Sequence, residues 1–312
     1  MRVAAAQARS PWLDVAAGVR KVIEFVRLAH DADVDLVAFP EAFLSGYPIW
    51  PTLTGGARFD DPRQKAAYAA YLDAAVELDG PELRQVTEAV RDLGVFTYLG
   101  ITERGVGSGR GTVYCTLVAI EPVRGMLSAH RKLMPTFEER LVWGTGDGNG
   151  LRVHDVAGLR VGGLSCWENW MPLARHALYA DGADLHVSTW PGSRRLTEDI
   201  TRFIAMEGRM FSVAACALID HADVPAGFPL RDEILASPTP SPYDGGSAIA
   251  GPDGKWLAEP VVGEERLVLA DLDPAVVRGA RQNFDPTGHY ARPDVFHVTI
   301  DRRRLTAATF LD

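Results

Sequence analysis

The sequence predicts an α/β protein in which two mixed β-sheets pack face to face and helices cover both outer sides, a four-layer αββα sandwich. Apolar runs of strand length outnumber the helical stretches along the chain. Some neighbouring runs are joined by short turns, which is typical of hairpins, whereas others are separated by a helix and indicate crossovers. This mixture favours two packed sheets with helices outside. No internal repeat or low-complexity linker divides the chain, so residues 1–312 are expected to form a single domain.

The N-terminal segment predicts a strand, a helix and a second strand. Residues 3–8 and 34–39 are apolar runs of strand length, and residues 15–30 place apolar side chains at helical spacing. Two further helices are expected, at residues 62–78 and 82–93. A proline just before the second of these and a glycine just after it favour its boundaries.

The remainder of the chain alternates many strands with a few helices. Strands are expected at residues 95–102, 112–121, 126–132, 151–156, 159–164, 183–189, 211–218, 247–250, 256–258 and 267–272. Helices are expected at residues 173–181, at 193–208 with Ser193 as the cap, and at 274–282. The Pro-rich excursion at residues 225–244 predicts a functional loop or an interface arm. Residues 283–312 have little periodicity, and we expect a C-terminal extension that packs on a neighbour.

Composition excludes several classes of protein. Acidic side chains outnumber basic ones by 41 to 32, and the longest basic cluster is Arg302–Arg304, so nucleic-acid binding is not expected. No apolar run reaches the roughly 18 residues that a membrane-spanning helix needs, and the N-terminus lacks the apolar segment of a signal peptide. Three widely spaced cysteines are too few for a disulfide framework or a zinc cluster, and their odd number fits a reducing compartment. We therefore expect a cytoplasmic protein.

Three reactive side chains each stand where an apolar strand becomes a loop. Glu41 follows the strand at residues 34–39, Lys132 ends a strand, and Cys166 follows the strand at residues 159–164. If these strands lie side by side, the three groups converge at one edge of a sheet, where α/β proteins usually place their chemistry. Each residue alone has an ordinary alternative, which is a helix-starting glutamate, a solvated lysine or a buried structural cysteine.

A carboxylate, an ammonium and a thiol together suffice for nucleophilic attack on an amide or a carbon–nitrogen multiple bond. A thiol with a pKa near about 8.5 is mostly protonated at neutral pH, so it needs a base or a neighbouring cation. Glu41 can be this base, and Lys132 can favour the thiolate. As charge develops on the substrate nitrogen or oxygen, Lys132 and a backbone N–H near Trp167 can stabilise it.

Other candidate residues are interpreted as structural. Cys115 and Cys216 lie inside expected strands, so we assign them to the core. The glycine-rich stretch at residues 144–150 is followed by a strand and not by a helix, so the physical basis of a phosphate site is missing. The scheme needs no histidine. The histidines therefore default to packing or surface roles, and only His130 is kept as a candidate at the substrate site.

Three sequence blocks resemble a known family. Phe-Pro-Glu at residues 39–41, His-Arg-Lys-Leu-Met-Pro-Thr at residues 130–136 and Cys-Trp-Glu-Asn at residues 166–169 are similar to the catalytic blocks of the nitrilase superfamily, in the same order. Pro-Thr-x-x-Glu-Arg-x-x-Trp-Gly from residue 135 and Gly-His-Tyr-x-Arg-Pro-Asp-Val-Phe from residue 288 resemble the nitrilase branch more than the amidase or carbamoylase branches.

The resemblance implies an αββα sandwich with a catalytic triad of Glu41, Lys132 and Cys166. It also implies a second glutamate, which we expect at Glu139, with the adjacent Glu138 as the competitor. The implied reaction converts an organic nitrile into a carboxylic acid and ammonia through a thioimidate on Cys166, without a metal or an organic cofactor. Alternatives are amide hydrolysis, hydration of a nitrile or of cyanide that stops at the amide, and, from a different class, a non-catalytic self-associating scaffold.

The resemblance also implies homo-oligomers, either dimers or longer spirals, that form through the helices after the lysine and cysteine blocks. The matching segments are residues 173–181 and 196–208, with Glu207 and Arg209. For the substrate pocket we expect Tyr47, Trp167 and Trp190 beside His130. Trp50 and Phe137 are equally well interpreted as core residues.

Overall fold

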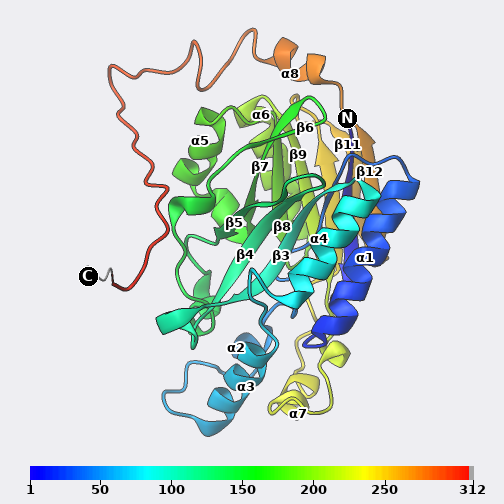
Figure 1. Ribbon diagram of the computed structural model, residues 1–312, viewed down its shortest axis with the longest axis vertical. Coiled ribbons are helices and arrows are strands. Elements are labelled where there is room, and N and C mark those ends of the chain that lie inside the picture. The colour runs from blue at the N-terminus through cyan, green and yellow to red at the C-terminus, as the bar shows by residue number, and fades with distance from the viewer. Residues whose placement is uncertain (309–312) are drawn as a thin grey trace.

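The computed structural model describes residues 1–308 (Figure 1). Its strands form two six-stranded halves of one curled sheet, in the orders β5-β4-β3-β2-β1-β12 and β6-β7-β8-β9-β10-β11. The halves are joined where the end of β1 pairs with β9, at Ala8 and Arg9. The first half comprises β1 (Arg2–Arg9), β2 (Leu36–Ala38), β3 (Phe96–Arg104), β4 (Val113–Glu121), β5 (Gly125–Arg131) and β12 (Arg266–Asp271). The second comprises β6 (His154–Val156), β7 (Leu159–Ser165), β8 (Leu185–Trp190), β9 (Phe211–Leu218), β10 (Gly245–Ala250) and β11 (Trp256–Val262).

The two halves pack face to face, and strand β1 illustrates why. Val3 and Ala5 belong to the apolar cluster between the sheets, whereas Ala4, Ala6 and Ala8 belong to the cluster beneath the helices outside. Alternate residues of a strand point to opposite faces, so a strand that is apolar at every position can be covered on both sides. The expected sandwich of two mixed sheets is therefore confirmed, although hydrogen bonds between β1 and β9 make the sheets continuous.

Helices cover both outer faces, as Figure 1 shows. Helices α1 (Val15–Asp31) and α4 (Pro81–Leu93) pack on the first half, while α5 (Pro172–Ala180) and α6 (Arg194–Gly208) pack on the second. The predicted boundaries of α4 are confirmed, because Pro81 lies in its first turn and Gly94 ends it with a φ of 71°. Among residues 1–308 no helix is long and apolar enough to cross a membrane.

Several predicted boundaries were wrong. The helix expected at residues 62–78 ends earlier, as α3 (Pro62–Asp73), because the backbone of Val76 turns to pair with β3. Ser193 precedes α6, but its side chain does not cap the helix, since its backbone adopts a φ of 120° and its N–H bonds to Gly245 O at 2.7 Å. Two short helices were not predicted, α2 (Trp50–Leu53) and α7 (Arg231–Leu235), and the latter lies in the Pro-rich excursion.

The C-terminal extension follows α8 (Pro274–Ala280) and runs along the outside of the molecule (Figure 1). Near its end it binds the same chain. Arg302 pairs with Asp181 at 2.9 Å, and Arg304 pairs with Asp147 at 3.1 Å. The packing of residues 283–312 on a neighbour stays a prediction, and the last four of these residues lie outside the described part of the chain.

Gly100 in β3 lies directly against the turn that contains Glu41. A Cβ at this position would come within 2.1 Å of the Pro40 carbonyl oxygen and 2.8 Å of the Glu41 Cα. We expect Gly100→Ala to lower the free energy of unfolding by about 1–3 kcal/mol, because backbone atoms must move to make room. Gly109→Ala is the matched control, since a Cβ there meets nothing within 4 Å. Urea unfolding of the two variants measures the difference, and equal midpoints would contradict the prediction.

Candidate active site

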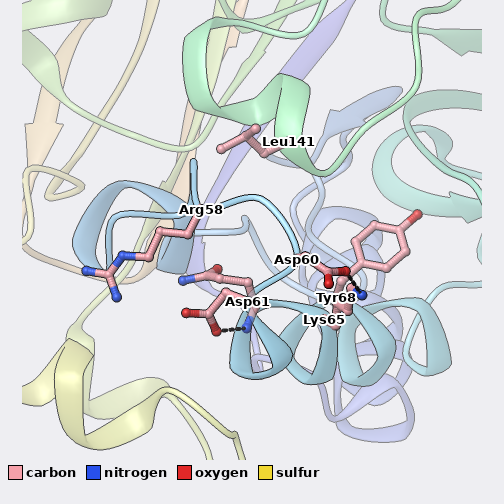
Figure 2. Close-up of a pocket in the computed structure, with 7 residues that line it drawn as sticks. Arg58, Asp60, Asp61, Lys65, Tyr68 and Leu141 are labelled. Carbon is pink, nitrogen blue, oxygen red and sulfur yellow. Dashed lines mark hydrogen bonds and ion pairs between the residues drawn. The ribbon is translucent and has the colours of Figure 1, made fainter.

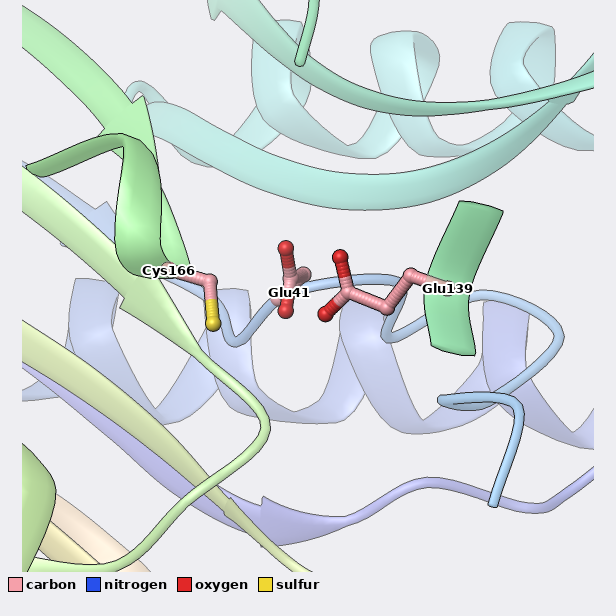
Figure 3. A group of neighbouring side chains, drawn as sticks. All are labelled: Glu41, Glu139 and Cys166. Carbon is pink, nitrogen blue, oxygen red and sulfur yellow. The ribbon is translucent and has the colours of Figure 1, made fainter. Parts of the chain in front are cut away.

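Four ionisable side chains from separate segments meet in the interior. One oxygen each of Glu41 and Glu139 and the Cys166 sulfur lie within 4.8 Å of one another, and Figure 3 shows Glu41 between the other two. Lys132 Nζ donates to Glu41 Oε1 at 2.8 Å and to Glu139 Oε2 at 2.6 Å. None of the four residues is more than 4% exposed. The predicted convergence of Glu41, Lys132 and Cys166 is thus present in the structure.

Glu41 is held by the turn that follows β2. Its N–H bonds to Trp190 O at 3.4 Å, and the next residue, Ala42, has a φ of 48°. Its Oε1 accepts hydrogen bonds from Lys132 and from the Cys115 thiol, the latter at 3.3 Å. Its Oε2 is buried and has no hydrogen-bond partner among the described residues. One carboxylate oxygen is therefore fixed, and the other is free to accept a proton.

Lys132 leaves the end of β5 and is fixed through its backbone. Its N–H bonds to Cys115 O at 2.8 Å, and its carbonyl accepts from Gly146 N at 2.9 Å. A Cβ at Gly146 would lie 2.1 Å from Arg131 O, so this position requires glycine. This close approach gives one glycine of the stretch at residues 144–150 a packing role against the lysine.

Glu139, and not its neighbour Glu138, faces Lys132. The short 3-10 helix η2 (Phe137–Leu141) begins with a capping box in which Thr136 N–H donates to Glu139 Oε2 at 2.6 Å. Glu139 Oε1 accepts from the Tyr47 hydroxyl at 2.8 Å. Glu138 only accepts a long bond of 3.4 Å from Thr52. The capping box fixes which of two adjacent glutamates points inward.

Cys166 sits on a strained turn between β7 and the 3-10 helix η4 (Cys166–Trp170). Its φ of 53° is rare for a residue with a side chain, and such strain must be held by its surroundings. Asn169 Nδ2 donates to Cys166 O at 2.8 Å, while Asn169 Oδ1 accepts from His186 at 2.6 Å and Ser188 at 2.9 Å. This buried network holds the turn so that the thiol projects from the strand end.

Glu168 links the cysteine turn to the lysine strand. Its carboxylate accepts from Ser165 N at 3.1 Å and from Leu133 N at 2.8 Å, one donor from each segment. His130 Nε2 lies 2.9 Å from the same group. Burial works against the charge on Glu168, but His130 and the backbone donors outweigh it and lower its pKa.

The structure places His130 against Glu168, and the expectation that His130 contacts substrate stays a prediction. Its Nε2 is taken up by Glu168 Oε1 and Oε2, at 2.9 and 3.0 Å, so the ring bridges two segments of the protein. Because the Glu168 carboxylate accepts hydrogen bonds, it favours the His130 tautomer that carries its proton on Nε2. His130 therefore takes part in the link that Glu168 makes between the lysine strand and the cysteine turn.

Burial and charge set the protonation of the cluster. Burial raises the pKa of Glu41 to about 7, although Lys132 pulls it down. Burial opposes the charge on Lys132, but Cys166, Glu41 and Glu139 outweigh it and raise the lysine pKa. Burial, followed by the charge of Glu41, raises the pKa of the Cys166 thiol well above its ordinary value, despite Lys132. Lys132 therefore favours the thiolate, as expected, but burial and the Glu41 charge outweigh its effect.

Aromatic rings surround part of the cluster. The Tyr47 ring packs edge-on against the rings of Trp143 and Tyr243, with ring centroids 5.6 Å and 5.4 Å apart respectively. Tyr243, in the Pro-rich excursion, was missed by the sequence reasoning. Burial raises the pKa of the Tyr243 hydroxyl, and the nearby Cys166 thiol raises it further. This contact gives the excursion a place beside the buried cluster.

The other aromatic candidates divide between core and surface. Trp190 is 1% exposed and shares an apolar cluster with Cys166. The Trp167 side chain is 43% exposed and packs on Trp170, and its backbone lies close to the Cys166 thiol. Trp50 is buried against Tyr71, whereas Phe137 is exposed to solvent and so is not the core residue that was one expectation.

The assignment of Cys115 to packing also requires a correction. Cys115 lies inside β4, as predicted, and is buried, but it is not a packing residue alone because its thiol donates to Glu41. Strand periodicity could not identify this contact, since it does not say which strand lies opposite. Cys216 is buried in an apolar cluster, in agreement with its assignment to the core.

A separate hollow of about 330 Å³ opens on the surface between α3 and η2 (Figure 2). Three of its charged groups, Asp60, Asp61 and Lys65, are engaged in local structure. Asp61 accepts from Arg63 N and Gln64 N at the start of α3, and Asp60 pairs with Lys65. The hollow offers no thiol among its lining residues, so the buried cluster is the better candidate for chemistry.

The sequence profile of the carbon-nitrogen hydrolase family matches residues 2–282. The chain belongs to this family. Curated relatives of this carbon-nitrogen hydrolase include a nitrilase of Bradyrhizobium diazoefficiens, 35% identical over 99% of this chain and 94% of the relative. An aliphatic nitrilase of Sinorhizobium fredii is 36% identical over 98% and 97% of the two chains. An arylacetonitrilase of Trametes versicolor is 34% identical over 92% of each.

Solved structures support the fold of this carbon-nitrogen hydrolase. A member of branch 10 of the nitrilase superfamily from Saccharomyces cerevisiae superposes with a TM-score of 0.71, covering 93% of this chain and 96% of its own at 18% identity. A carbon-nitrogen hydrolase from Helicobacter pylori has a TM-score of 0.70, covering 95% and 96% at 16% identity. The four-layer sandwich is therefore the fold of this superfamily, and the chain is a hydrolase of carbon–nitrogen bonds.

Removing the Glu168 carboxylate tests the link between the two segments. We expect Glu168→Ala to lower the free energy of unfolding by about 3–5 kcal/mol, because it leaves two buried N–H groups and His130 without their acceptor. The control Glu138→Ala removes a half-buried carboxylate nearby and should change stability by at most about 0.5 kcal/mol. Chemical denaturation followed by circular dichroism measures both, and a small effect of Glu168→Ala would refute the linking role.

Proposed function

We propose that this carbon-nitrogen hydrolase is a nitrilase that converts organic nitriles to carboxylic acids and ammonia. The observation that supports this most strongly is the buried cluster of Cys166, Glu41, Lys132 and Glu139. The cluster occurs in a chain that is 33–36% identical, over nearly its whole length, to proteins named nitrilases. A thiol with a free carboxylate oxygen and an ammonium nearby has the groups that addition to a nitrile requires.

The first step forms a covalent adduct on Cys166. Glu41 Oε2 accepts the thiol proton as the sulfur attacks the nitrile carbon, so no free thiolate has to be maintained. The C≡N bond becomes C=N as the S–C bond forms, and the nitrogen takes up the proton that Glu41 accepted, which gives a thioimidate and restores the Glu41 carboxylate. Lys132 stabilises the developing negative charge, and Glu139 holds Lys132 in place.

Hydrolysis of the thioimidate needs two water molecules. Glu41 removes a proton from the first water, which adds to the carbon and gives a tetrahedral intermediate. Cleavage of its C–N bond, with a proton transferred to nitrogen, releases ammonia and leaves a thioester. The second water then releases the carboxylic acid and restores the thiol. Cleavage of the C–S bond in the intermediate would release the amide instead, so the same site can give both products.

We assign the substrate pocket to the aromatic residues that lie near the thiol. Tyr47 and Tyr243 form its polar rim, because their half-buried rings pack together next to Glu139. Trp190 forms its apolar wall. Phenol and indole rings provide apolar area and a few donors, which suits nitriles whose side group is apolar.

A nitrile panel assayed with the wild type and Cys166→Ala together tests the proposed activity. We expect ammonia release and carboxylic acid from the wild type and a loss of at least about a thousandfold in the variant, because the nucleophile is gone. Chromatography quantifies the amide as a fraction of product. If the wild type hydrolyses only amides, or if Cys166→Ala stays active on nitriles, the nitrilase assignment is wrong. If the protein turns over neither nitriles nor amides, and Cys166 does not react with a thiol-directed electrophile, the chain is the non-catalytic scaffold.

We further propose that the protein forms homo-oligomers through η4, α5 and α6. Large apolar side chains are exposed on these elements, with Leu173 at 68%, and the others are Trp167, Trp170, Phe203 and Met206. Several exposed large apolar groups on neighbouring elements are typical of interfaces. Glu207, a candidate contact, already pairs with Arg175 of its own chain at 2.6 Å. Residues 283–312 are proposed to pack on a neighbour, and the cytoplasmic location stays a prediction.

Introducing a charge at Leu173 tests the proposed interface. We expect Leu173→Lys to lower the molar mass measured by sedimentation velocity, because a buried lysine without a partner opposes association. Leu257→Lys on β11 is the control, since Leu257 is also exposed, at 47%, but lies elsewhere on the molecule. A wild type that sediments as a monomer, or a mass unchanged in Leu173→Lys, would contradict the proposal.

A further inference from the structure

We propose that Cys115 is a positioning residue for the base Glu41: its thiol holds one carboxylate oxygen and thereby leaves the other as the proton acceptor. This inference rests on the proposed function, in which Glu41 takes the proton of Cys166. Cys115 touches neither substrate nor the reacting atoms in that scheme. It acts through Glu41.

The contacts of Glu41 are unequal between its two oxygens. Oε1 accepts from Lys132 at 2.8 Å and from the Cys115 thiol at 3.3 Å, whereas Oε2 is buried with no partner among the described residues. A carboxylate oxygen with two donors is a poorer base than one with none, because each donor stabilises its lone pairs. Cys115 and Lys132 together therefore assign the basic role to Oε2.

Cys115 also contacts Lys132, which is the other hydrogen-bond donor to Glu41 Oε1. Its carbonyl oxygen accepts the backbone N–H of Lys132 at 2.8 Å, while its thiol reaches Glu41. A single residue of β4 thus contacts both the base Glu41, which follows β2, and Lys132, which follows β5. Strand β4 lies between β3 and β5, so its inward side chain can reach both.

Cys216 provides a comparison for a thiol without a carboxylate partner. It is also buried and also lies within a strand, β9, in a cluster that contains Cys166, Trp190, Ile200 and Ile204. Burial raises the pKa of Cys216, and hydrogen bonds with the hydroxyls of Thr197 and Ser247 oppose this shift. Cys115 therefore differs from Cys216 in that its thiol donates to Glu41.

The Cys115 thiol acts as a donor that keeps its proton. Burial, followed by the charge of Glu41, raises the Cys115 pKa well above its ordinary value. The charged and titratable groups around Glu41 are Lys132, Glu139, Cys115 and Cys166, from four different segments, together with the hydroxyls of Tyr47, Tyr71 and Tyr243. Since the thiol hydrogen bond favours the ionised form of Glu41, its loss raises the Glu41 pKa.

The test compares Cys115→Ala, Cys115→Ser and Cys216→Ala by the pH dependence of kcat/KM for a nitrile. Activity of the wild type rises with pH as Glu41 loses its proton, with a limb expected near pH 7. We expect Cys115→Ala to shift this rise in activity to higher pH by about half a unit or more, because one donor to the Glu41 carboxylate is lost. Cys115→Ser keeps a donor, so its limb should lie at or below that of the wild type. Cys216→Ala should leave the limb in place.

A second readout separates this inference from the proposed function. Alkylation of Cys166 by iodoacetamide, followed by peptide mass spectrometry, reports the same proton transfer to Glu41 without any turnover. If the wild type turns over no nitrile or amide, the proposed function fails, and a shift in the alkylation limb of Cys115→Ala still supports the positioning role. Equal limbs in all variants, or a loss of kcat/KM in Cys115→Ala that is uniform across pH, would overturn it. If Cys115→Ala fails to fold, Cys115→Ser decides: a limb above the wild-type value overturns the role.

Discussion

One buried ammonium is shared by two buried carboxylates, and the chemistry of the protein depends on this arrangement. Lys132 donates to Glu41 and to Glu139, and neither partner is more than 4% exposed. Burying a charge without a partner is costly, so each group requires the other two. Because two carboxylates face one ammonium, the set is one positive charge short of balance. Burial is the main reason why the pKa of Glu41 is raised to about 7, and the second carboxylate, Glu139, adds to this shift while Lys132 opposes it.

The cluster is precise because short hydrogen bonds fix the backbone that surrounds it. Glu168 accepts N–H groups from both the lysine segment and the cysteine segment, and Asn169 holds the carbonyl of Cys166. These bonds hold a nucleophile at a positive φ, a conformation that the isolated turn would not keep. At Gly100 and Gly146 a neighbouring backbone segment comes so close that only glycine fits. These close approaches pack the segments that carry Glu41 and Lys132 against the rest of the sheet. The positions of the reactive groups thus follow from the scaffold, before any substrate binds.

The sequence was sufficient to predict the sandwich and the three strand ends, because alternation and apolar runs follow from burial on one or two faces of a sheet. It failed where the answer depended on which strands face each other. Cys115 lies in a predicted strand, but only the tertiary pairing brings it to Glu41. Tyr243 lies in a loop whose path has no periodicity. The choice of Glu139 over Glu138 was open to local reasoning, since Thr136 and Glu139 have the spacing of a capping box.

The resting state of the site bears on how the nucleophile is made. A cysteine beside a lysine suggests a standing thiolate, yet burial and the Glu41 charge raise the Cys166 pKa well above its ordinary value. A base with a pKa near 7 cannot remove the proton of such a thiol to any large extent at equilibrium. Proton transfer must therefore accompany formation of the S–C bond, when the charge passes from sulfur to the substrate nitrogen beside Lys132. Lys132 accordingly stabilises the transition state more than it stabilises the resting thiol. A charged group accelerates a reaction only when it stabilises the transition state more than the resting state.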